Sequence, residues 1–217
     1  MKSKYILKLI IFCLLIITPF AAYSGEIDEK EAAEFAQVQG QKLLGIFAEP
    51  DRRIKYKQLD DLFLNYVDLE HISRFVIGKY WRQMDEEQQA QYQDLFKRYA
   101  TNIYKGFPLN FDKNLDFVVT SSRKEGKDVF VGTDIEYIDS SGKKSTFLVE
   151  FRMHKRDGRL MITDIKIGES SLILSYRTRF YKMVVDADED MDWFLEDFEL
   201  STISAEKTYA LPDDDED

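Results

Sequence analysis

The sequence has 217 residues, 44% of them hydrophobic, with 16 Phe, 12 Tyr and 2 Trp, and this predicts one globular domain and argues against a disordered or fibrous chain. The net charge is −10, and residues 186–217 hold 14 acids against a single base, Lys207, so the body of the mature chain is close to neutral. A neutral body with an acidic end argues against non-specific nucleic-acid binding, which needs a basic face to displace counterions, and against standing adsorption to anionic lipid headgroups.

The first 24 residues have the pattern of a secretory signal peptide. A lysine-rich start precedes a short apolar run at residues 9–17, and Ala22-Tyr23-Ser24 places small residues at the two recognition positions of a cleavage site. The apolar run is too short to be a convincing membrane span; an uncleaved N-terminal anchor is the alternative. We therefore predict that residues 1–24 are removed before Gly25.

Cysteine usage indicates the compartment. The one cysteine of the sequence, Cys13, lies inside the predicted signal peptide, and Phe12 before it is not the small residue that bacterial lipid attachment normally needs. The mature chain therefore has no cysteine. An exported protein without disulfides is typical of a bacterial periplasm and not of an animal extracellular domain.

The mature chain is predicted to begin with helices. Asp28 and Glu31 have the spacing of a capping box, and apolar residues recur at helical spacing until Pro50. A second helix is expected over residues 53–66, with its apolar side chains on one face.

The next stretch, residues 68–107, reads as two helices hinged at Gly78. Asp68 is a good N-cap for the first helix, and Asp85 with Gln88 forms a capping box for the second. The second helix carries a broad apolar stripe, made of Tyr92, Leu95, Phe96, Tyr99, Ile103 and Phe107. A stripe this broad needs a large apolar partner surface.

After residue 108 the pattern changes from helical spacing to alternation, which predicts strands. Asp157-Gly158 is a tight hairpin signal between two of them. We expect a curved four-stranded antiparallel meander, with strands at residues 115–121, 128–138, 146–154 and 160–168.

Two more helices are expected after the strands. Ser170 or Ser171 caps the first, the second is short and carries Trp193 and Phe198, and residues 205–217 should form a disordered acidic tail. Helices, then a sheet, then helices indicate an α+β fold with a helical layer packed on one face of the sheet. Such a fold commonly encloses one deep apolar pocket; side chains filling that space are the alternative.

Motifs for catalysis or metal binding are not found in the sequence. His71 and His154 are far apart and match no zinc motif, and no Gly-x-Ser-x-Gly elbow or phosphate-binding glycine loop occurs. A catalytic acid/base dyad, formed by a tyrosine such as Tyr80 with an acid such as Asp134 or Asp164, remains an alternative. Alternating acids from Asp186 resemble a calcium loop, but the turn glycine is missing, and a helix N-terminus rich in acids explains them more simply.

Two groups of residues carry a family signature. The first comprises Val67-Asp68, Ile72 and Val76-Ile77-Gly78-Lys79-Tyr80-Trp81-Arg82, with Gln88, Phe96 and Tyr104 after them. The second comprises Asp164-Ile165-Lys166-Ile167, Ser171-Leu172, Tyr176-Arg177 and Phe180. In this order and spacing they resemble the MlaC family, also called toluene-tolerance auxiliary proteins, over roughly residues 30–200.

The chain also departs from the family pattern. The family usually has an aromatic residue near Met161 and an acid-Gly pair where this chain reads Gly168-Glu169, and the acidic end from Asp186 is not a family hallmark. These departures concern the rim of the pocket and the docking of partners more than the fold.

The resemblance implies a non-enzymatic periplasmic phospholipid carrier of Gram-negative bacteria. Such proteins hold acyl chains in a pocket between sheet and helices and leave the headgroup largely exposed. Their partners are an inner-membrane ABC transporter complex and an outer-membrane lipoprotein complex, and no cofactor is implied. Residues 25–204 would form the lipid-binding domain, between the signal peptide and the tail at residues 205–217.

The apolar pattern suggests which side chains line such a pocket. The candidates for acyl-chain contact are Phe75, Val76, Phe96, Tyr99, Ile103, Val131, Ile135, Val149, Phe151 and Ile165. Plain core packing is the competing interpretation for each of them. Two further functions stay open for the whole protein: an exported interaction module with a closed core, and a pocket enzyme of isomerase or dehydratase type with a perturbed acid.

Overall fold

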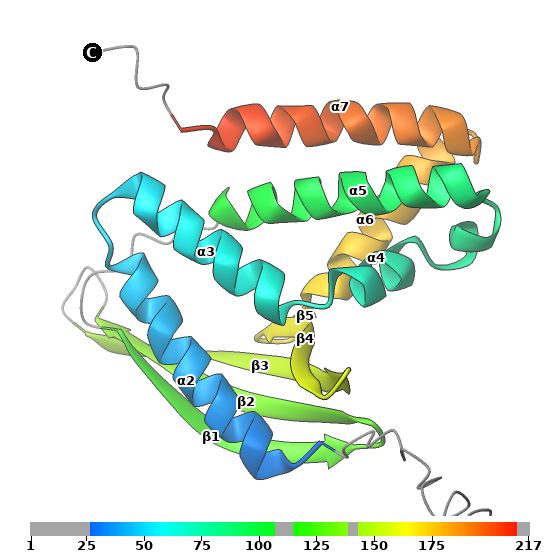
Figure 1. Ribbon diagram of the computed structural model, residues 1–217. Helices are drawn as coiled ribbons and strands as arrows, with labels where there is room; N and C mark the ends of the chain where they lie inside the picture. Colours follow the sequence, from blue (N-terminus) through cyan, green and yellow to red (C-terminus); the bar gives the residue numbers. More distant parts are fainter. Residues whose placement is uncertain (1–26, 107–114, 139–142, 212–217) are drawn as a thin grey trace, which may run out of the picture.

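The computed structural model describes residues 27–106, 115–138 and 143–211. Within these ranges the chain forms six α-helices, short 3₁₀ helices and a five-stranded sheet (Figure 1). Helices come first, then strands, then helices, so the predicted α+β fold is confirmed. Among the described helices, none is long and apolar enough to cross a membrane. The predicted signal peptide lies outside the described residues.

The strands lie side by side in chain order, and every pair is antiparallel. They are β1 (Asp116–Glu125), β2 (Asp128–Ile138), β3 (Lys144–Arg156), β4 (Arg159–Ile167) and β5 (Ser170–Ser171). The prediction of four strands was therefore one short. The chain reverses at Gly168, where φ is 59°, and the two residues of β5 pair with the end of β4 before the next helix begins.

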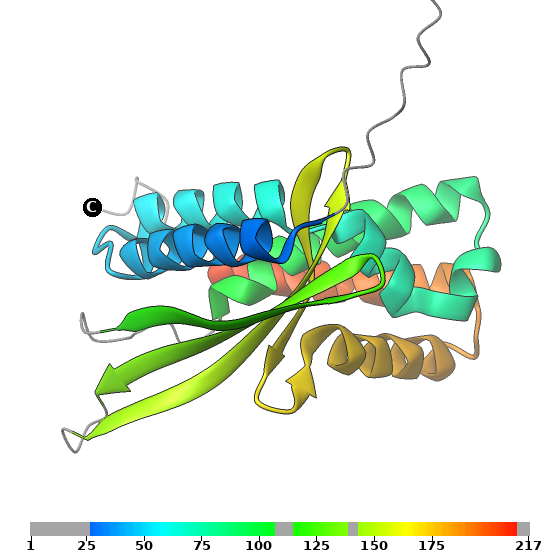
Figure 2. The same cartoon turned by 90° about the horizontal axis from the view of Figure 1, so that it is seen from below.

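Turns and bulges set the shape of the sheet. The β3–β4 hairpin turns at Asp157-Gly158, as predicted, with φ values of 51° and 76° that suit a two-residue hairpin. The register shifts once after Val119 in β1 and once after Arg152 in β3. Such irregularities bend a strand and increase its twist, and the strands in Figure 2 are visibly twisted.

Helix α2 (Glu29–Phe47) lies on the sheet over β1 and β2 (Figures 1 and 2). Gly40 permits a close approach, because a Cβ there would lie 2.4 Å from the ring of Phe117. The Gln37 side chain then satisfies the open edge of β1: its amide donates to the carbonyl of Phe117 at 2.8 Å and accepts from the N–H of Val119 at 3.1 Å. Helix α2 thus covers both a face and an edge of the sheet.

The other helices pack mainly on one another. They are α3 (Arg52–Tyr66), α4 (Leu69–Ile77), α5 (Glu86–Ile103), α6 (Leu172–Asp186) and α7 (Met191–Tyr209), with the 3₁₀ helices η1 (Gly78–Arg82) and η2 (Tyr104–Gly106). Gly78, with φ 56°, ends α4 and begins η1, which confirms the predicted hinge. The capping box of Asp85 and Gln88 is present at the start of α5.

Aromatic rings form the centre of this helical layer. The rings of Phe180 and Phe198 lie 4.9 Å apart, and Tyr92, Phe194 and Phe96 surround them; Tyr92, Phe180, Phe194 and Phe198 are at most 1% exposed. The apolar stripe of α5 therefore faces α6 and α7 and not the sheet. Helix α2 lies along the sheet, and α3, α4 and α6 contact it at β4.

The helical layer joins the sheet at β4. Val67, between α3 and α4, forms a bridge with Ile162, and the N–H of Asp68 donates to the Ile162 carbonyl at 2.9 Å. At the other end of β4, the buried Asp164 accepts hydrogen bonds from the Ser171 hydroxyl at 2.6 Å and from the N–H of Ile173 at 3.2 Å. Strand β4 thus fixes the start of both α4 and α6.

The C-terminal helix is longer than predicted. Helix α7 runs from Met191 to Tyr209, and Ala205 within it is 6% exposed. A disordered tail beginning at residue 205 is therefore wrong as far as Tyr209, because apolar contacts with the helical layer hold the last turns. Residues 212–217 of the predicted tail lie outside the described residues.

Candidate functional site

One face of the sheet presents mostly apolar side chains toward the helices. Alternation places every second residue of each strand on this face. Cross-strand pairs extend it from strand to strand: Val131 with Phe151, Phe151 with Ile165, Ile135 with Phe147, and Val149 with Ile167.

The part of this face under α2 is closed. Ala32 and Ala36 of α2 pack with Val129, Val131 and Met153, and the three sheet residues are at most 1% exposed. This sheet cluster has Phe151 and Ile165 partly buried at its border. It is an ordinary packed core and leaves no space at Val131.

Toward the opposite strand ends, the described residues cover this face less completely. Ile135 and Phe147 are half-buried, and Ile167 is 42% exposed beside the buried Val149. Figure 2 shows β2 and β3 lying progressively farther from α2 than β1 does. This region, comprising Ile135, Phe147, Val149, Ile165 and Ile167, is called the open sheet end below.

The ten predicted pocket residues lie in different parts of the molecule, four of them with the aromatic cluster and three with the sheet cluster. Val76, Phe96 and Tyr99 are buried in the aromatic cluster of the helical layer, and Ile103 packs against it. Phe75 is half-buried under the guanidinium of Arg177, at 4.9 Å from its ring centroid. The five sheet residues lie on the inner face, and three of them, Ile135, Val149 and Ile165, belong to the open sheet end. The structure does not bring all ten into one cavity.

Two residues of the open sheet end were missing from the predicted lining. Phe147 and Ile167 share the face of Val149 through the register of β2, β3 and β4. The alternation of the strands contained this signal, since Phe147 lies two residues before Val149 and Ile167 two residues after Ile165. Only the strand register shows that they are neighbours.

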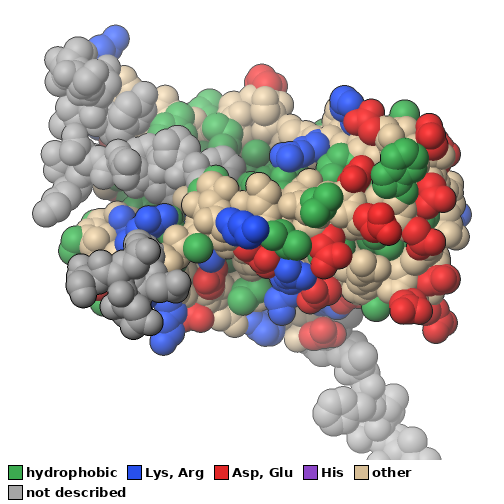
Figure 3. Space-filling view, turned by 90° about the horizontal axis from the view of Figure 1, so that it is seen from above, with side chains coloured by type: hydrophobic (Ala, Val, Ile, Leu, Met, Phe, Trp, Pro, Cys, Tyr) green, Lys and Arg blue, Asp and Glu red, His purple; other side chains and the backbone are tan. Residues whose placement is uncertain are grey.

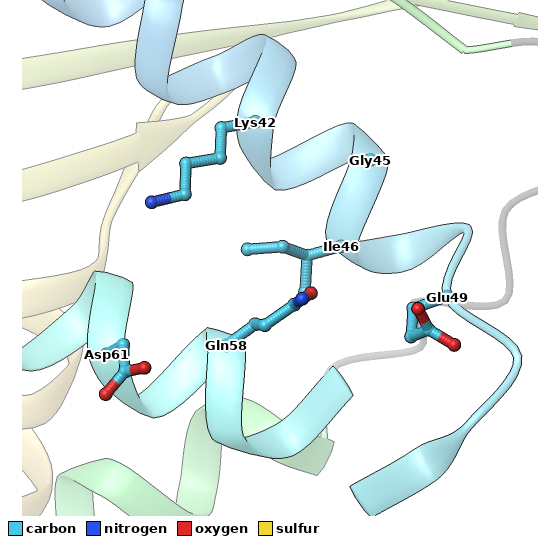
Figure 4. A pocket seen from close by; sticks show the side chains of 6 residues that line it. All are labelled: Lys42, Gly45, Ile46, Glu49, Gln58 and Asp61. Carbon is cyan, nitrogen blue, oxygen red and sulfur yellow. The ribbon is translucent and has the colours of Figure 1, made fainter. Parts of the chain in front are cut away.

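A cavity of about 470 Å³ lies elsewhere, between α2 and α3. It is open, has polar and apolar surface in similar measure, and is lined by Lys42, Gly45, Ile46, Glu49, Gln58 and Asp61. Figure 4 shows Lys42 and Ile46 extending from α2 toward α3. None of the ten predicted pocket residues lines this cavity, and its polar side chains do not suit acyl chains.

The two histidines meet at a buried carboxylate. Asp68, 2% exposed, lies 2.7 Å from Nε2 of His154 and accepts a 2.7 Å hydrogen bond from Arg156, while its other role is to cap α4 through the N–H of His71 at 3.0 Å. The ring centroids of His71 and His154 are 5.2 Å apart. This Asp68 cluster ties the β3–β4 hairpin to α4.

Electrostatics within the Asp68 cluster follow from burial and from its charges. Burial by itself would raise the pKa of Asp68, but the hydrogen bonds from the His71 N–H and from His154, together with the charge of Arg156, lower it below its usual value. Burial, and then the neighbouring His154, lower the pKa of His71. No group of acids, histidines or cysteines that could hold a metal ion occurs among the described residues.

The acid/base dyads considered from the sequence are not assembled. The Tyr80 hydroxyl donates to Glu189 at 2.9 Å, and Asp164 is occupied by Ser171 and the start of α6. The acids that resemble a calcium loop lie at the α6–α7 turn, where Asp190 caps α7 by accepting from the N–H of Trp193 at 3.0 Å. These contacts are structural.

Comparisons with known proteins point to one family. The family model described as MlaC protein matches residues 39–198. A solved structure of a phospholipid-binding protein from Ralstonia solanacearum, in complex with a phospholipid, has 20% sequence identity and a TM-score of 0.64, covering 82% of this chain and 99% of that chain. A variant of Rd1NTF2 aligns with a TM-score of only 0.31 and 16% identity over 65% of this chain, too low to support an argument. No curated protein matches the sequence.

Proposed function

Because this chain belongs to the MlaC family, we propose that it is a non-enzymatic carrier of phospholipids in the bacterial periplasm. The observation that carries the proposal is the family match over residues 39–198. The shared fold with a protein solved in complex with a phospholipid supports it, as does the N-terminal pattern of a signal peptide.

We place the acyl chains at the open sheet end, between the sheet and the helical layer. Ile135, Val149 and Ile165 from the predicted lining would contact the chains, with Phe147 and Ile167 beside them. The apolar character of this face, and the exposure of Ile167 to 42% beside the buried Val149, support the placement. Of the helical residues in the predicted lining, Val76, Phe96 and Tyr99 are buried in the aromatic cluster, so we assign the chain contacts to the sheet residues alone.

The energetics explain why a carrier needs an apolar pocket and few polar contacts. Burial of one methylene gains about 0.8 kcal/mol, so two acyl chains with roughly 30 methylenes gain about 25 kcal/mol over water. A bilayer offers nearly the same free energy. The net direction of transfer must therefore come from partners and not from the pocket itself.

The family suggests those partners. We propose that the protein exchanges lipid with an inner-membrane ABC transporter complex and with an outer-membrane lipoprotein complex, and so contributes to the lipid asymmetry of the outer membrane. The nearly neutral body of the mature chain is consistent with a carrier that moves between two membranes without adhering to either.

Native mass spectrometry tests the proposal directly. The protein is purified from the periplasm and weighed under native conditions, and whatever co-purifies is extracted and identified. We expect a stoichiometric mass increase that matches a diacyl phospholipid. An apo mass, with no uptake from labelled liposomes, would refute a carrier and favour an interaction module with a closed core.

A further inference from the structure

The outer face of α7 leaves two large apolar side chains in water. The opposite side of the helix, with Phe194 and Phe198, is buried against α5 and α6. On the outer side Trp193 is 50% exposed and Leu200 is 66% exposed. They are seven residues apart, which puts them on one line of the helix about 10 Å from each other. No described element covers this line.

Acidic side chains border the apolar line on both sides. Glu196 and Asp197 are exposed next to it, and neither forms an ion pair with a described residue. Asp192 lies at the start of the helix, where it accepts a 2.6 Å hydrogen bond from Gln88.

The surrounding surface continues the acidic character. Asp85, Glu86 and Glu87 at the start of α5 and Asp188 and Glu189 in the α6–α7 turn are also exposed. The contact of Gln88 with Asp192 places the starts of α5 and α7 together. Figure 3 shows Asp and Glu side chains gathered at this end of the molecule with apolar side chains among them.

Exposed apolar side chains with a rim of one charge are typical of a protein interface. Tryptophan is enriched among the residues that contribute most to binding, and charges around it steer a complementary partner and set the association rate. A membrane surface is a poor fit, because anionic headgroups would be repelled by the acids.

We propose that this outer face of α7, with Trp193 and Leu200 at its centre and Glu196 and Asp197 beside them, docks a partner protein whose apolar contact residues are bordered by lysine and arginine. The surface lies on the helical layer, away from the open sheet end. The docking proposal does not depend on what the pocket holds. Either proposal can therefore be refuted while the other stands.

Two synthetic helical peptides test the proposed surface. The first carries leucines at heptad positions flanked by lysines; the second keeps the lysines and replaces each leucine with serine. In a Trp81→Phe background, Trp193 is the only tryptophan of the protein, so its fluorescence reports contact directly. We expect the leucine peptide to bind with a blue shift of the Trp193 emission, and the serine peptide to bind at least tenfold more weakly.

Variants made without the Trp81→Phe substitution separate the apolar contribution from the charge. Binding of a dye-labelled leucine peptide should weaken at least tenfold in Trp193→Ser/Leu200→Ser, whereas Glu196→Gln/Asp197→Asn should mainly lower the association rate and its salt dependence. Val38→Ser, at a side chain 59% exposed on α2, is the matched control and should bind normally.

Three outcomes would overturn the proposal. Equal binding of both peptides would indicate simple adsorption of a polycation, and unchanged binding by the Trp193→Ser/Leu200→Ser variant would show that the apolar line is not in contact. A blue shift of Trp193 with vesicles containing anionic lipid, but not with the leucine peptide, would assign the surface to a membrane. Lipid uptake by the same variants tests the carrier proposal separately.

Discussion

At the scale of single residues, Asp68 combines roles that the sequence shows only in part. Its position before an apolar helix predicts an N-cap, and the structure adds His154 and Arg156 from the β3–β4 hairpin. The buried carboxylate therefore links the helical layer to the sheet through His154 and Arg156, which are 86 and 88 residues away in the chain. Its loss should affect more than the start of one helix.

Replacing Asp68 with alanine should lower the free energy of unfolding by about 3 kcal/mol, because the variant loses a cap and leaves Arg156 and His154 of the hairpin without their buried partner. Urea unfolding measures the change. Asp85→Ala, at the exposed N-cap of α5, is the matched control and should cost only about 1 kcal/mol. Equal effects in the two variants would show that the contacts across the layers contribute nothing.

The lowered pKa of His71 predicts a dependence of stability on pH. The unfolded chain takes up a proton near pH 6.5, whereas the folded state resists it until a lower pH, so stability should fall as the pH drops from about 7 toward 5. The lowered pKa of Asp68 adds a second loss, below about pH 4, as its carboxylate becomes protonated.

Urea midpoints at pH 7, 6 and 5 measure the histidine contribution. His71→Gln removes the titrating ring, so the decline over this range should become shallower than in the wild type. The same decline in both proteins would mean that another group controls it.

At the scale of elements, the contact of α2 with β1 depends on one of two glycines in the helix. A side chain at Gly40 would meet the ring of Phe117 at 2.4 Å, whereas nothing lies within 4 Å of a Cβ placed at Gly45. Phe117 is 2% exposed and cannot move freely. The same substitution should therefore have opposite effects at the two positions.

Gly40→Ala should destabilise the protein by about 1–3 kcal/mol through overpacking. Gly45→Ala should stabilise it by up to about 1 kcal/mol, because alanine favours the helical conformation. Thermal unfolding of both variants checks the signs. A stabilising Gly40→Ala would show that α2 can shift away from β1 without loss.

The local sequence pattern did not predict where several helices and strands end. The strands β1 and β3 extend beyond their predicted ends, and α7 has 19 residues where a short helix was predicted. Polar residues such as Glu206 interrupt the apolar pattern of α7. The Glu206 carboxylate nevertheless accepts hydrogen bonds from Arg98 at 2.8 Å and 3.0 Å, and so holds the last turns of α7 to α5. A partner that is distant in sequence cannot be seen in a local window.

At the scale of the whole molecule, the one domain predicted from length and composition contains two apolar clusters. One is the aromatic cluster of the helical layer, and the other joins α2 to the sheet. They meet mainly through β4, and among the described residues the open sheet end touches a cluster only at Ile165. A carrier requires such a region, because a ligand can enter only where the protein's own side chains do not complete the packing.

Two neighbouring residues of β3 provide a test at this scale. Val149 is 5% exposed on the inner face, while Leu148 is 61% exposed on the outer face. Val149→Trp should reduce uptake of labelled phospholipid from liposomes at least tenfold while the protein remains folded. Leu148→Trp should change neither uptake nor folding. Unfolding of Val149→Trp would favour a closed core, and normal uptake by it would refute this part of the lining.

The sequence by itself determined the local features of this protein and its family. Helix caps such as Asp68 and Asp85, the hinge at Gly78 and the turn at Asp157-Gly158 depend on a few adjacent residues, and the structure confirms them. The α+β order followed from the change from helical spacing to alternation of apolar residues. The MlaC signature was identified from the sequence alone.

Only the tertiary structure decided which apolar surfaces meet. The apolar stripe of α5 could be buried equally well against the sheet or against another helix, because the hydrophobic effect is non-directional. Packing selected α6 and α7, and thereby separated Phe96 and Tyr99 from Val131 and Ile165. The same packing brought His71 to His154 and left Trp193 in water, since neither depends on spacing along the chain.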